Sequence, residues 1–527
     1  MTTPLPVRKE NRGRLGLSCA LALLSSALLL LASPGESATL PLAAWFALTP
    51  LLYRLAGHSP RQAALLGLIC GLAYYGPLLR WIIIVLATYG EVPLALAGLA
   101  LFFLTCYMSC YLALFAFLCA WVSKKIPLLV AAPILWVSLD LIRSMLFTGF
   151  PWFDLGYTQH SIPHLIQIAD LTGHHGVSFL IVLTNALIVA LACFFFKSGT
   201  PHNFRGITAA LILLGLAFSY NFWRLDAVSK EIAGSERTVV AVAQGNFPQN
   251  QKWLPAFQEE TVATYLRLSR EAIARNKPQL VVWPETALPF YPFEHPLFLR
   301  LQTELTAPEQ VWLLTGAPHR ERVTGSEQIN YFNSAFLLTP LGAVSGRYDK
   351  QHLVPFGEYI PFRSVLAFAS PVVETLGDFS SGNADTPLSC QKSRIGVLIC
   401  FESIFPELSR KQAANGANLL INITNDAWFG KSGAPWQHLS MAVFRAVETR
   451  KSLVRAANTG ISAFIDPLGR MQAESELFSQ YAGSESVVLL EGKSGYVRLG
   501  HLFPWACLLL SLAGVLWFSR TKKDSGV

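Results

Sequence analysis

Charged side chains are scarce in this chain. Asp, Glu, Lys and Arg make up only 14% of its 527 residues, whereas an ordinary soluble protein carries about a quarter charged residues. Hydrophobic residues make up 52%, and the mean hydropathy is +0.40. This composition excludes an ordinary soluble protein over the whole length and predicts a lipid-facing region.

Cysteine is scarce outside the apolar segments. Seven of the nine cysteines lie in apolar runs, where a small polarizable side chain usually packs. Cys390 and Cys400 remain, and in an oxidising compartment they could form a disulfide.

The sequence lacks a stripe of basic residues. The net charge is +8, but the first basic residues lie directly before an apolar run. That position is typical of a membrane-orientation signal, so we expect no nucleic-acid partner.

Apolar residues are concentrated before about residue 224 and after residue 500. A helix needs roughly 20 apolar residues to cross a bilayer. We predict about eight spans, at residues 15–32, 38–55, 62–88, 92–122, 126–148, 164–196, 206–223 and 501–519. A cleaved signal peptide is the alternative for the first, but its apolar run is long and further spans follow at once. The predicted units are a membrane domain at 1–224, a globular domain at 237–492 and a last span at 500–520.

Basic residues mark one set of loops. They occur at the amino terminus, in residues 54–61, 124–125 and 197–205, and in the tail at 520–523. The alternate loops, 34–39 and 89–91, contain no Lys or Arg. Cytoplasmic loops carry the excess of basic residues. We therefore predict that both termini are cytoplasmic and that the globular segment faces the other side, which in a bacterium is the periplasm or the exterior.

Four ionisable residues fall in or near apolar runs: Arg80, Asp140, Arg143 and Asp170. At that depth a charge is costly unless it is paired or hydrated. Asp140 and Arg143 are three residues apart on one helix face, which favours an ion pair. A lipid-headgroup role is the alternative, and the sequence leaves both open.

The pattern changes between residues 237 and 492. Short apolar runs predict strands at 239–244, 280–284, 312–316, 334–338, 395–400, 419–424 and 454–457. Residues 256–276 and 435–451 have the spacing of surface helices. The segment is therefore predicted to be a layered α/β domain.

Reactive side chains lie at three strand ends. Glu285 follows the run VVWP (281–284), Lys350 follows RYD (347–349), and Cys400 ends the strand IGVLIC (395–400). Each alone is more often a solvated loop residue or a disulfide partner. Together they form a nucleophile, a base and a cation, which favours covalent catalysis.

These blocks resemble the nitrilase superfamily. WPET (283–286), YDK (348–350) with PFGEYIP (355–361), and ICFE (399–402) are similar to its three catalytic blocks. The PFGEY variant, the later NDAWFG (425–430) and the flanking spans resemble the apolipoprotein N-acyltransferases, its membrane-anchored branch. The resemblance implies an αββα sandwich beside a polytopic helical domain, with Cys400, Glu285 and Lys350 as catalytic triad and no metal or cofactor.

The resemblance also implies a reaction and its partners. A phospholipid, with phosphatidylethanolamine preferred, would give an acyl chain to Cys400 as a thioester, and the α-amino group of an S-diacylglyceryl cysteine in an apolipoprotein would receive it. The expected protein is a monomer in the bacterial inner membrane. Glu358 and Glu402 match supporting acidic positions, and Trp253 and Trp428 match aromatic positions at the site mouth, with ordinary packing as the alternative. Many family members have tyrosine at the position of Phe401, so only its backbone N–H is expected to act, on the oxyanion.

Two groups of apolar residues follow catalytic blocks. Loops of this kind can enter the membrane interface or cover an acyl chain, although buried packing is a comparable interpretation. They are Phe290, Tyr291 and Phe293, and then Phe356, Tyr359, Ile360, Phe362, Leu366 and Phe368.

Other classes of function compete with an acyltransferase. A membrane-tethered amidase or lipid acyl hydrolase would pass its acyl group to water, and free fatty acid without amide would identify it. A transporter or scaffold with an inactive enzymatic domain is disfavoured because all three triad positions carry the expected residue types.

Overall fold

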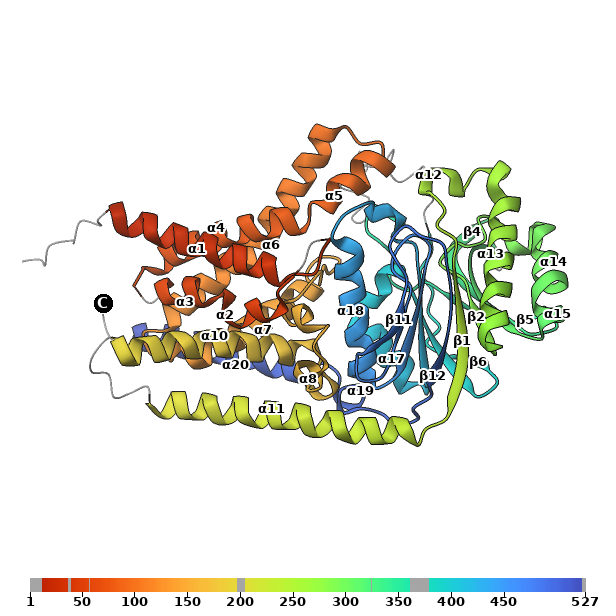
Figure 1. Ribbon diagram of the computed structural model, residues 1–527. Coiled ribbons are helices and arrows are strands. Elements are labelled where there is room, and N and C mark those ends of the chain that lie inside the picture. Colours follow the sequence, from red (N-terminus) through yellow and green to blue (C-terminus); the bar gives the residue numbers. More distant parts are fainter. Residues whose placement is uncertain are drawn as a thin grey trace, which may run out of the picture.

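The computed structural model describes residues 12–36, 39–55, 57–196, 204–323, 325–360 and 379–523. A helical bundle and an α/β sandwich lie side by side (Figure 1). The helix α11 (Phe204–Ala233) runs along the bundle and leads into the first strand, and α20 (Leu502–Lys523) returns from the sandwich to the bundle. The chain therefore enters and leaves the sandwich on its bundle side.

Long apolar helices build the bundle together with several short ones. The long helices besides α11 and α20 are α1 (Arg12–Ala32), α4 (Pro60–Leu78), α6 (Leu94–Val122), α7 (Leu128–Met145) and α10 (His174–Phe196). The short elements are η1 (Pro41–Ala43), α2 (Ala44–Ala47), α3 (Thr49–Leu55), α5 (Trp81–Ile84), η2 (Val85–Tyr89), η3 (Leu155–Gln159), α8 (Pro163–Ile166) and α9 (Ala169–Thr172).

Five of the described helices are long and apolar enough to cross a membrane. A sixth span results if α4 and the segment Trp81–Tyr89, bent by 47° relative to each other, count as one. The apolar part of α20, Leu502–Trp517, is shorter. The chain thus has a membrane-type helical region, while the count of about eight spans stays a prediction.

Two predicted spans differ from the structure. The described part of span 38–55 forms three short elements, because Pro41 at the start of η1 and Pro50 in the first turn of α3 lack the backbone N–H that a continuous helix requires. The Oδ1 of Asn185 on α10 accepts hydrogen bonds from the backbone N–H groups of Leu48 and Thr49 at 2.8 and 2.9 Å. Span 164–196 starts only at His174, since Gly173 at φ +66° ends α9.

The four ionisable residues in or near the apolar runs are paired within the protein. Arg143 lies 3.2 Å from Asp140 and also contacts Asp154, and all three are buried. Asp170 pairs with Arg224 at 2.6 Å and with Arg450 of the sandwich at 3.0 Å. The exposed Arg80 pairs with Glu36 at 3.2 Å. The ion-pair interpretation therefore holds for Asp140 and Arg143.

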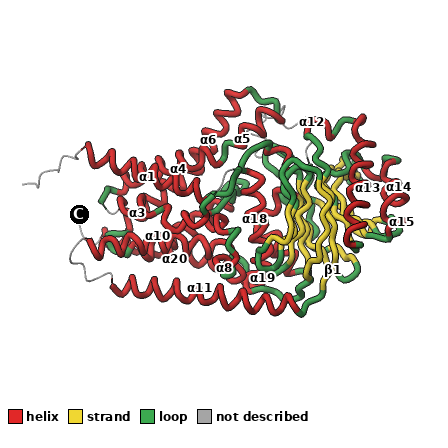
Figure 2. The backbone as a smooth tube through the Cα atoms, in the orientation of Figure 1, coloured by secondary structure: helices red, strands yellow, loops and turns green. Residues whose placement is uncertain are grey.

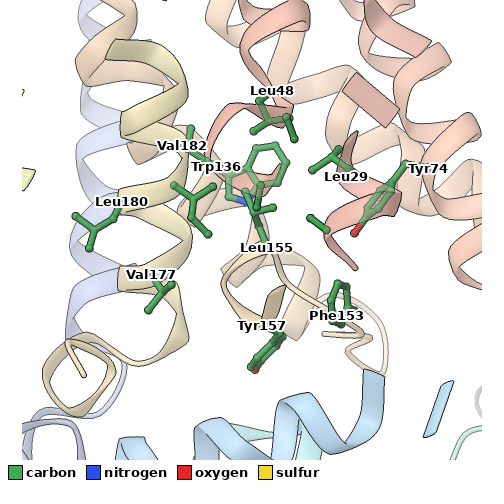
Figure 3. Close-up of a cluster of buried hydrophobic side chains, with 14 of the residues drawn as sticks. Leu29, Leu48, Tyr74, Trp136, Phe153, Leu155, Tyr157, Val177, Leu180 and Val182 are labelled. Atoms are coloured by element: carbon green, nitrogen blue, oxygen red, sulfur yellow. The ribbon is translucent and has the colours of Figure 1, made fainter. Parts of the chain in front are cut away.

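A hydrophobic core fills the bundle and continues to the sandwich. Figure 3 shows Leu29, Leu48, Tyr74 and Trp136 facing one another between the helices. Phe153 and Tyr157 lie lower in the same view, and the Tyr157 ring packs edge-on against Phe444 at 5.1 Å. The core is continuous across the junction, so the two parts are packed together rather than merely tethered.

Two six-stranded sheets form the sandwich. Their strand orders are β12-β1-β2-β3-β4-β5 and β11-β10-β9-β8-β7-β6. The first sheet contains β1 (Arg237–Gln244), β2 (Leu280–Val282), β3 (Trp312–Arg322), β4 (Ile329–Leu338), β5 (Val344–Asp349) and β12 (Tyr481–Val488). The second contains β6 (Leu388–Cys390), β7 (Ser393–Ile399), β8 (Leu419–Thr424), β9 (Ser452–Ala457), β10 (Ala463–Ile465) and β11 (Met471–Glu474).

Helices cover both outer faces of the sheets, which gives the expected αββα layers. Figure 2 shows α13 (Pro255–Asn276) on the face away from the bundle and α18 (Ala434–Thr449) on the face toward it. The remaining helical elements are α12 (Gln249–Lys252), η5 (Pro292–Glu294), α14 (Leu297–Leu301), η6 (Gln302–Thr306), α15 (Ala307–Glu309), η8 (Cys400–Ile404), α17 (Pro406–Ala414), η9 (Asp426–Phe429) and α19 (Gly495–Leu499). Apolar side chains of both sheets, such as Val242 and Val397, meet between them.

The helix α18 is not a surface helix, so that prediction was wrong. All of its residues except Trp436 are buried, because the helix is enclosed between the bundle and the second sheet. Its polar side chains face partners rather than water: Gln437 accepts from Trp152 of the bundle at 2.7 Å, and Arg445 pairs with Glu448 at 3.0 Å. The polar side chains of α18 therefore form contacts at the junction between the bundle and the sandwich.

Candidate active site

The three predicted catalytic residues follow three different strands. Glu285 lies after β2 and Lys350 directly after β5 in the first sheet, whereas Cys400 follows β7 in the second. The Lys350 Nζ lies 3.5 Å from Glu285 Oε1, and the charges of both side chains act on the thiol of Cys400. All three are buried. The two sheets therefore bring the three residues into one enclosed site.

Glu285 is fixed by donors on both carboxylate oxygens. Asn333 Nδ2 donates to Oε1 at 2.7 Å, and the backbone N–H of Asn425 donates to Oε2 at 2.9 Å. Gly316 on β3 allows the Glu285 loop to approach, since a Cβ there would lie 2.7 Å from the Cα of Glu285. The carboxylate is thus pre-positioned by the fold.

Lys350 is held as a cation by two carboxylates. Its Nζ donates to Glu358 Oε1 at 2.9 Å, and Asn333 donates to the same oxygen at 3.0 Å. Burial alone would lower the pKa of Lys350, but the charges of Glu358 and Glu285 raise it above its ordinary value. The amine therefore stays protonated and can stabilise a developing negative charge.

Cys400 lies at a sharp turn between β7 and η8. Its φ is +52°, a backbone conformation that is rare for a residue with a side chain and is common at functional sites. Burial raises the pKa of its thiol, and the charge of Glu285 raises it further, while Lys350 lowers it. The resting side chain is a thiol that needs a base, and Glu285 is the neighbouring carboxylate.

The chain is similar to known proteins over most of its length. A model of the apolipoprotein N-acyltransferase N-terminal domain matches residues 25–187, and a carbon-nitrogen hydrolase model matches residues 239–482. An apolipoprotein N-acyltransferase from Geobacter metallireducens is 46% identical over 93% of this chain and 92% of its own length. One from Nitrosomonas europaea is 35% identical over 90% of this chain and 93% of its own length.

The chain belongs to the apolipoprotein N-acyltransferase family. It is therefore an acyltransferase and a membrane protein with a carbon-nitrogen hydrolase domain. Two solved structures are similar to about half of this chain: a carbon-nitrogen hydrolase from Helicobacter pylori G27, at 19% identity and a TM-score of 0.37, and an amidase from Nesterenkonia sp., at 20% identity and a TM-score of 0.36. The match covers 51% of this chain and 94% of the first structure, and 50% and 93% for the second.

Glu402 lies beneath the site of this family member. Its buried carboxylate accepts from the backbone N–H groups of Gln351 and Ile399, both at 2.7 Å, and from the Tyr348 hydroxyl at 3.0 Å. Burial raises its pKa to about 7, against the effect of these donors. Glu402 thus connects the segment after Lys350 to the strand that carries Cys400.

The aromatic candidates lie in three different surroundings. Trp428 packs edge-on against Tyr89 of the bundle at 5.6 Å, and Trp253 is 43% exposed directly after α12. The Phe401 ring packs against Phe405 at 5.2 Å, so it is a packing side chain. Of the two predicted loop groups, Phe293 and Phe356 are exposed, whereas Phe290 and Ile360 are buried. Phe362, Leu366 and Phe368 lie outside the described residues.

Sequence reasoning missed polar residues that hold the site. Asn333 lies inside β4, and Lys252 at the end of α12 donates from a buried amine to the backbone carbonyl of Glu285 at 2.9 Å. Burial lowers the pKa of Lys252 to about 8. A lone Asn or Lys carries no recognisable motif, and only the paired geometry shows its contribution.

A second missed group lies behind Cys400. The His438 Nε2 lies 3.1 Å from the carbonyl oxygen of Cys400, and since that oxygen can only accept, the ring donates there. Its Nδ1 lies 3.0 Å from the Arg455 guanidinium, which pairs with Asp426 at 2.7 Å. All three side chains are buried. The alternative disulfide is excluded, since Cys390 and Cys400 are both free.

One group among the described residues has the spacing of metal ligands. Ligand atoms of Asp154, His174 and His175 lie within 4.8 Å of one another. However, Asp154 already pairs with Arg143 and, at 2.7 Å, with His174. A guanidinium beside the carboxylate opposes a second cation, so this group belongs to the ion-pair network of the junction.

Proposed function

We propose that this protein transfers a fatty acyl chain from a phospholipid, through a thioester on Cys400, to the α-amino group of the S-diacylglyceryl cysteine of an apolipoprotein. The observation that carries the proposal is the buried Glu285–Lys350 pair acting on Cys400 in a domain packed against a membrane-type bundle. A soluble amidase would have no use for that bundle. Phosphatidylethanolamine is the proposed donor.

In the first half reaction the Cys400 sulfur attacks the ester carbonyl of the phospholipid. Glu285 takes the thiol proton as the new C–S bond forms, and returns it to the departing glycerol oxygen when the C–O bond breaks. Lys350 and the backbone N–H of Phe401 stabilise the oxyanion. The products are a thioester and a lysophospholipid.

In the second half reaction the lipoprotein amine attacks the thioester carbonyl. Glu285 accepts a proton from the amine and passes it to the departing Cys400 sulfur, which restores the thiol. The product is an amide. Glu358 holds the Lys350 amine, and Glu402 connects the segment after Lys350 to the strand that carries Cys400. Trp253 and Trp428 border the path of the substrates.

The setting of the reaction is part of the proposal. The enzyme acts as a monomer in the bacterial inner membrane, with its sandwich on the periplasmic side and both termini in the cytoplasm. The proposed units are the membrane domain at 1–224, the catalytic domain at 237–492 and a last span at 500–520. The basic loops of the bundle support this orientation.

Acyl transfer can be tested by trapping the thioester. Purified protein given phospholipid with a labelled acyl chain and no acceptor is expected to retain a hydroxylamine-labile label. Cys400→Ala abolishes it, while Cys390→Ala keeps it, because Cys390 is a buried thiol on the neighbouring strand β6. Lys350→Ala slows the labelling, because the activation free energy rises by about 3 kcal/mol, the typical effect of losing one oxyanion donor.

Two results would contradict the proposal. A label that survives Cys400→Ala would remove the nucleophile. Release of free fatty acid without amide, when a diacylglyceryl peptide is supplied, would instead identify an amidase or lipid acyl hydrolase.

A further inference from the structure

An open groove lies where the bundle meets the sandwich. Its volume is about 790 Å³, and it is bordered by the end of α7, by Phe405 with the start of α17, and by α19 with the start of α20. None of Cys400, Glu285 and Lys350 lines it. We call it the junction groove, and it is distinct from the catalytic site.

One half of the junction groove is apolar and faces outward. Met145 of α7 and Leu502 and Trp505 of α20 line it, and all three are exposed. The exposed apolar surface continues along α20 with Leu509, Leu512 and Leu516. In a membrane protein such a helix face contacts acyl chains, and an exposed tryptophan at its start is typical of the bilayer interface.

The other half carries charge. Arg410 of α17 is neutralised by Glu407, to which it donates at 2.7 and 2.6 Å. The exposed Arg498 of α19 also lines the groove, and no ion pair links it to any residue that the structure describes. His501 lies 3.9 Å from Glu407. The junction groove therefore offers one uncompensated guanidinium together with its apolar half.

We propose that the junction groove binds one anionic phospholipid, with its phosphate at Arg498 and its acyl chains along Leu502 and Trp505. A guanidinium at the bilayer surface binds a phosphate through charge-assisted hydrogen bonds. The bound lipid holds α17 and α19 of the sandwich against the membrane, and its binding does not depend on chemistry at Cys400.

Native mass spectrometry of the full-length Cys400→Ala protein in neutral detergent tests the proposal without turnover. Phosphatidylglycerol is expected to give a retained adduct, and phosphatidylcholine a much weaker one. Arg498→Gln should weaken phosphatidylglycerol binding about tenfold, the effect of losing one charged hydrogen bond. Arg498→Lys should keep part of the affinity. Arg322→Gln, an exposed arginine at the far end of β3, is the matched control and should bind like the parent.

The outcomes separate lipid from other ligands. Equal phosphatidylglycerol binding by Arg498→Gln and its parent overturns the proposal, as does equal binding of phosphatidylcholine. Displacement of the adduct by millimolar inorganic phosphate would identify a simple anion site and would also overturn it. Since Arg498 is exposed, its variants should keep the melting temperature of the parent. Failure of thioester labelling in the protein that retains Cys400 would contradict the proposed acyl transfer and would leave the lipid-binding result unchanged.

Discussion

At the scale of single residues, Cys400 is buried and lies near one cation, Lys350, and one carboxylate, Glu285. Burial raises the pKa of the thiol, and the two neighbouring charges act in opposite directions: Glu285 raises it and Lys350 lowers it. A free thiolate is therefore not the resting species. Proton transfer to Glu285 and attack on the ester are expected to occur together, which keeps the nucleophile inactive until a substrate fills the site.

The pH dependence of Cys400 alkylation tests this balance. The midpoint for reaction with iodoacetamide should lie above the ordinary thiol pKa. Lys350→Met removes the charge that favours the thiolate, so the midpoint should rise, whereas Glu285→Gln removes the charge that opposes it, so the midpoint should fall. Each change should be about one pH unit or more, as for neighbouring charges.

The peptide that contains Cys400 is followed by mass spectrometry, in a Cys390→Ala background so that the reading comes from one catalytic-domain thiol. Movement of both midpoints in the same direction would contradict the opposing roles of Glu285 and Lys350.

At the scale of elements, the turn between β7 and η8 is supported from behind by α18. His438 donates to the carbonyl of Cys400 at 3.1 Å, and its neighbour Gln437 contacts Trp152 in the bundle. A residue at φ +52° keeps its conformation only where its surroundings hold it. The helix thus links the position of the nucleophile to the packing of the membrane domain.

His438→Ala is expected to lower kcat for acyl transfer by about 100-fold, the effect of misplacing a reacting group by about 1 Å. KM for the phospholipid should change little, because His438 is buried and lies behind Cys400. His438→Gln supplies an amide donor and should recover part of the rate. Steady-state kinetics together with the melting temperature separate positioning from stability: a loss confined to KM, or equal losses in both variants, would contradict the role.

The central strands could be predicted from the sequence, because the apolar runs at 280–284, 395–400 and 419–424 correspond to β2, β7 and β8. The edge strands β6 and β11 could not, since edge strands are short and partly exposed, as in Met471–Glu474. Residues 38–55 are as apolar as a span, yet prolines divide them. Asn333 and His438 were missed because hydrogen bonding between distant strands and helices leaves no local pattern.

At the scale of the whole molecule, the basic residues and the arrangement of the two domains predict the same orientation in the membrane. The start of α1 and the end of α20 lie at the end of the bundle that is remote from the sandwich (Figure 1). Basic residues lie at these helix ends, at Arg12 and Arg14 and at Lys522 and Lys523. Since basic residues stay in the cytoplasm, the sandwich is expected on the opposite side of the bilayer.

Single introduced cysteines test this orientation. Glu327→Cys lies in the β3–β4 connection, where the native side chain is 91% exposed, and Lys124→Cys lies in the exposed turn between α6 and α7. In cells with a permeabilised outer membrane, an impermeant maleimide should label the peptide at position 327 without lysis. The peptide at position 124 should react only after the inner membrane is opened. The reverse pattern would place the catalytic domain in the cytoplasm and would contradict the predicted orientation. Labelling of both positions before lysis would show that the protein inserts in two orientations, and it would contradict the prediction as well.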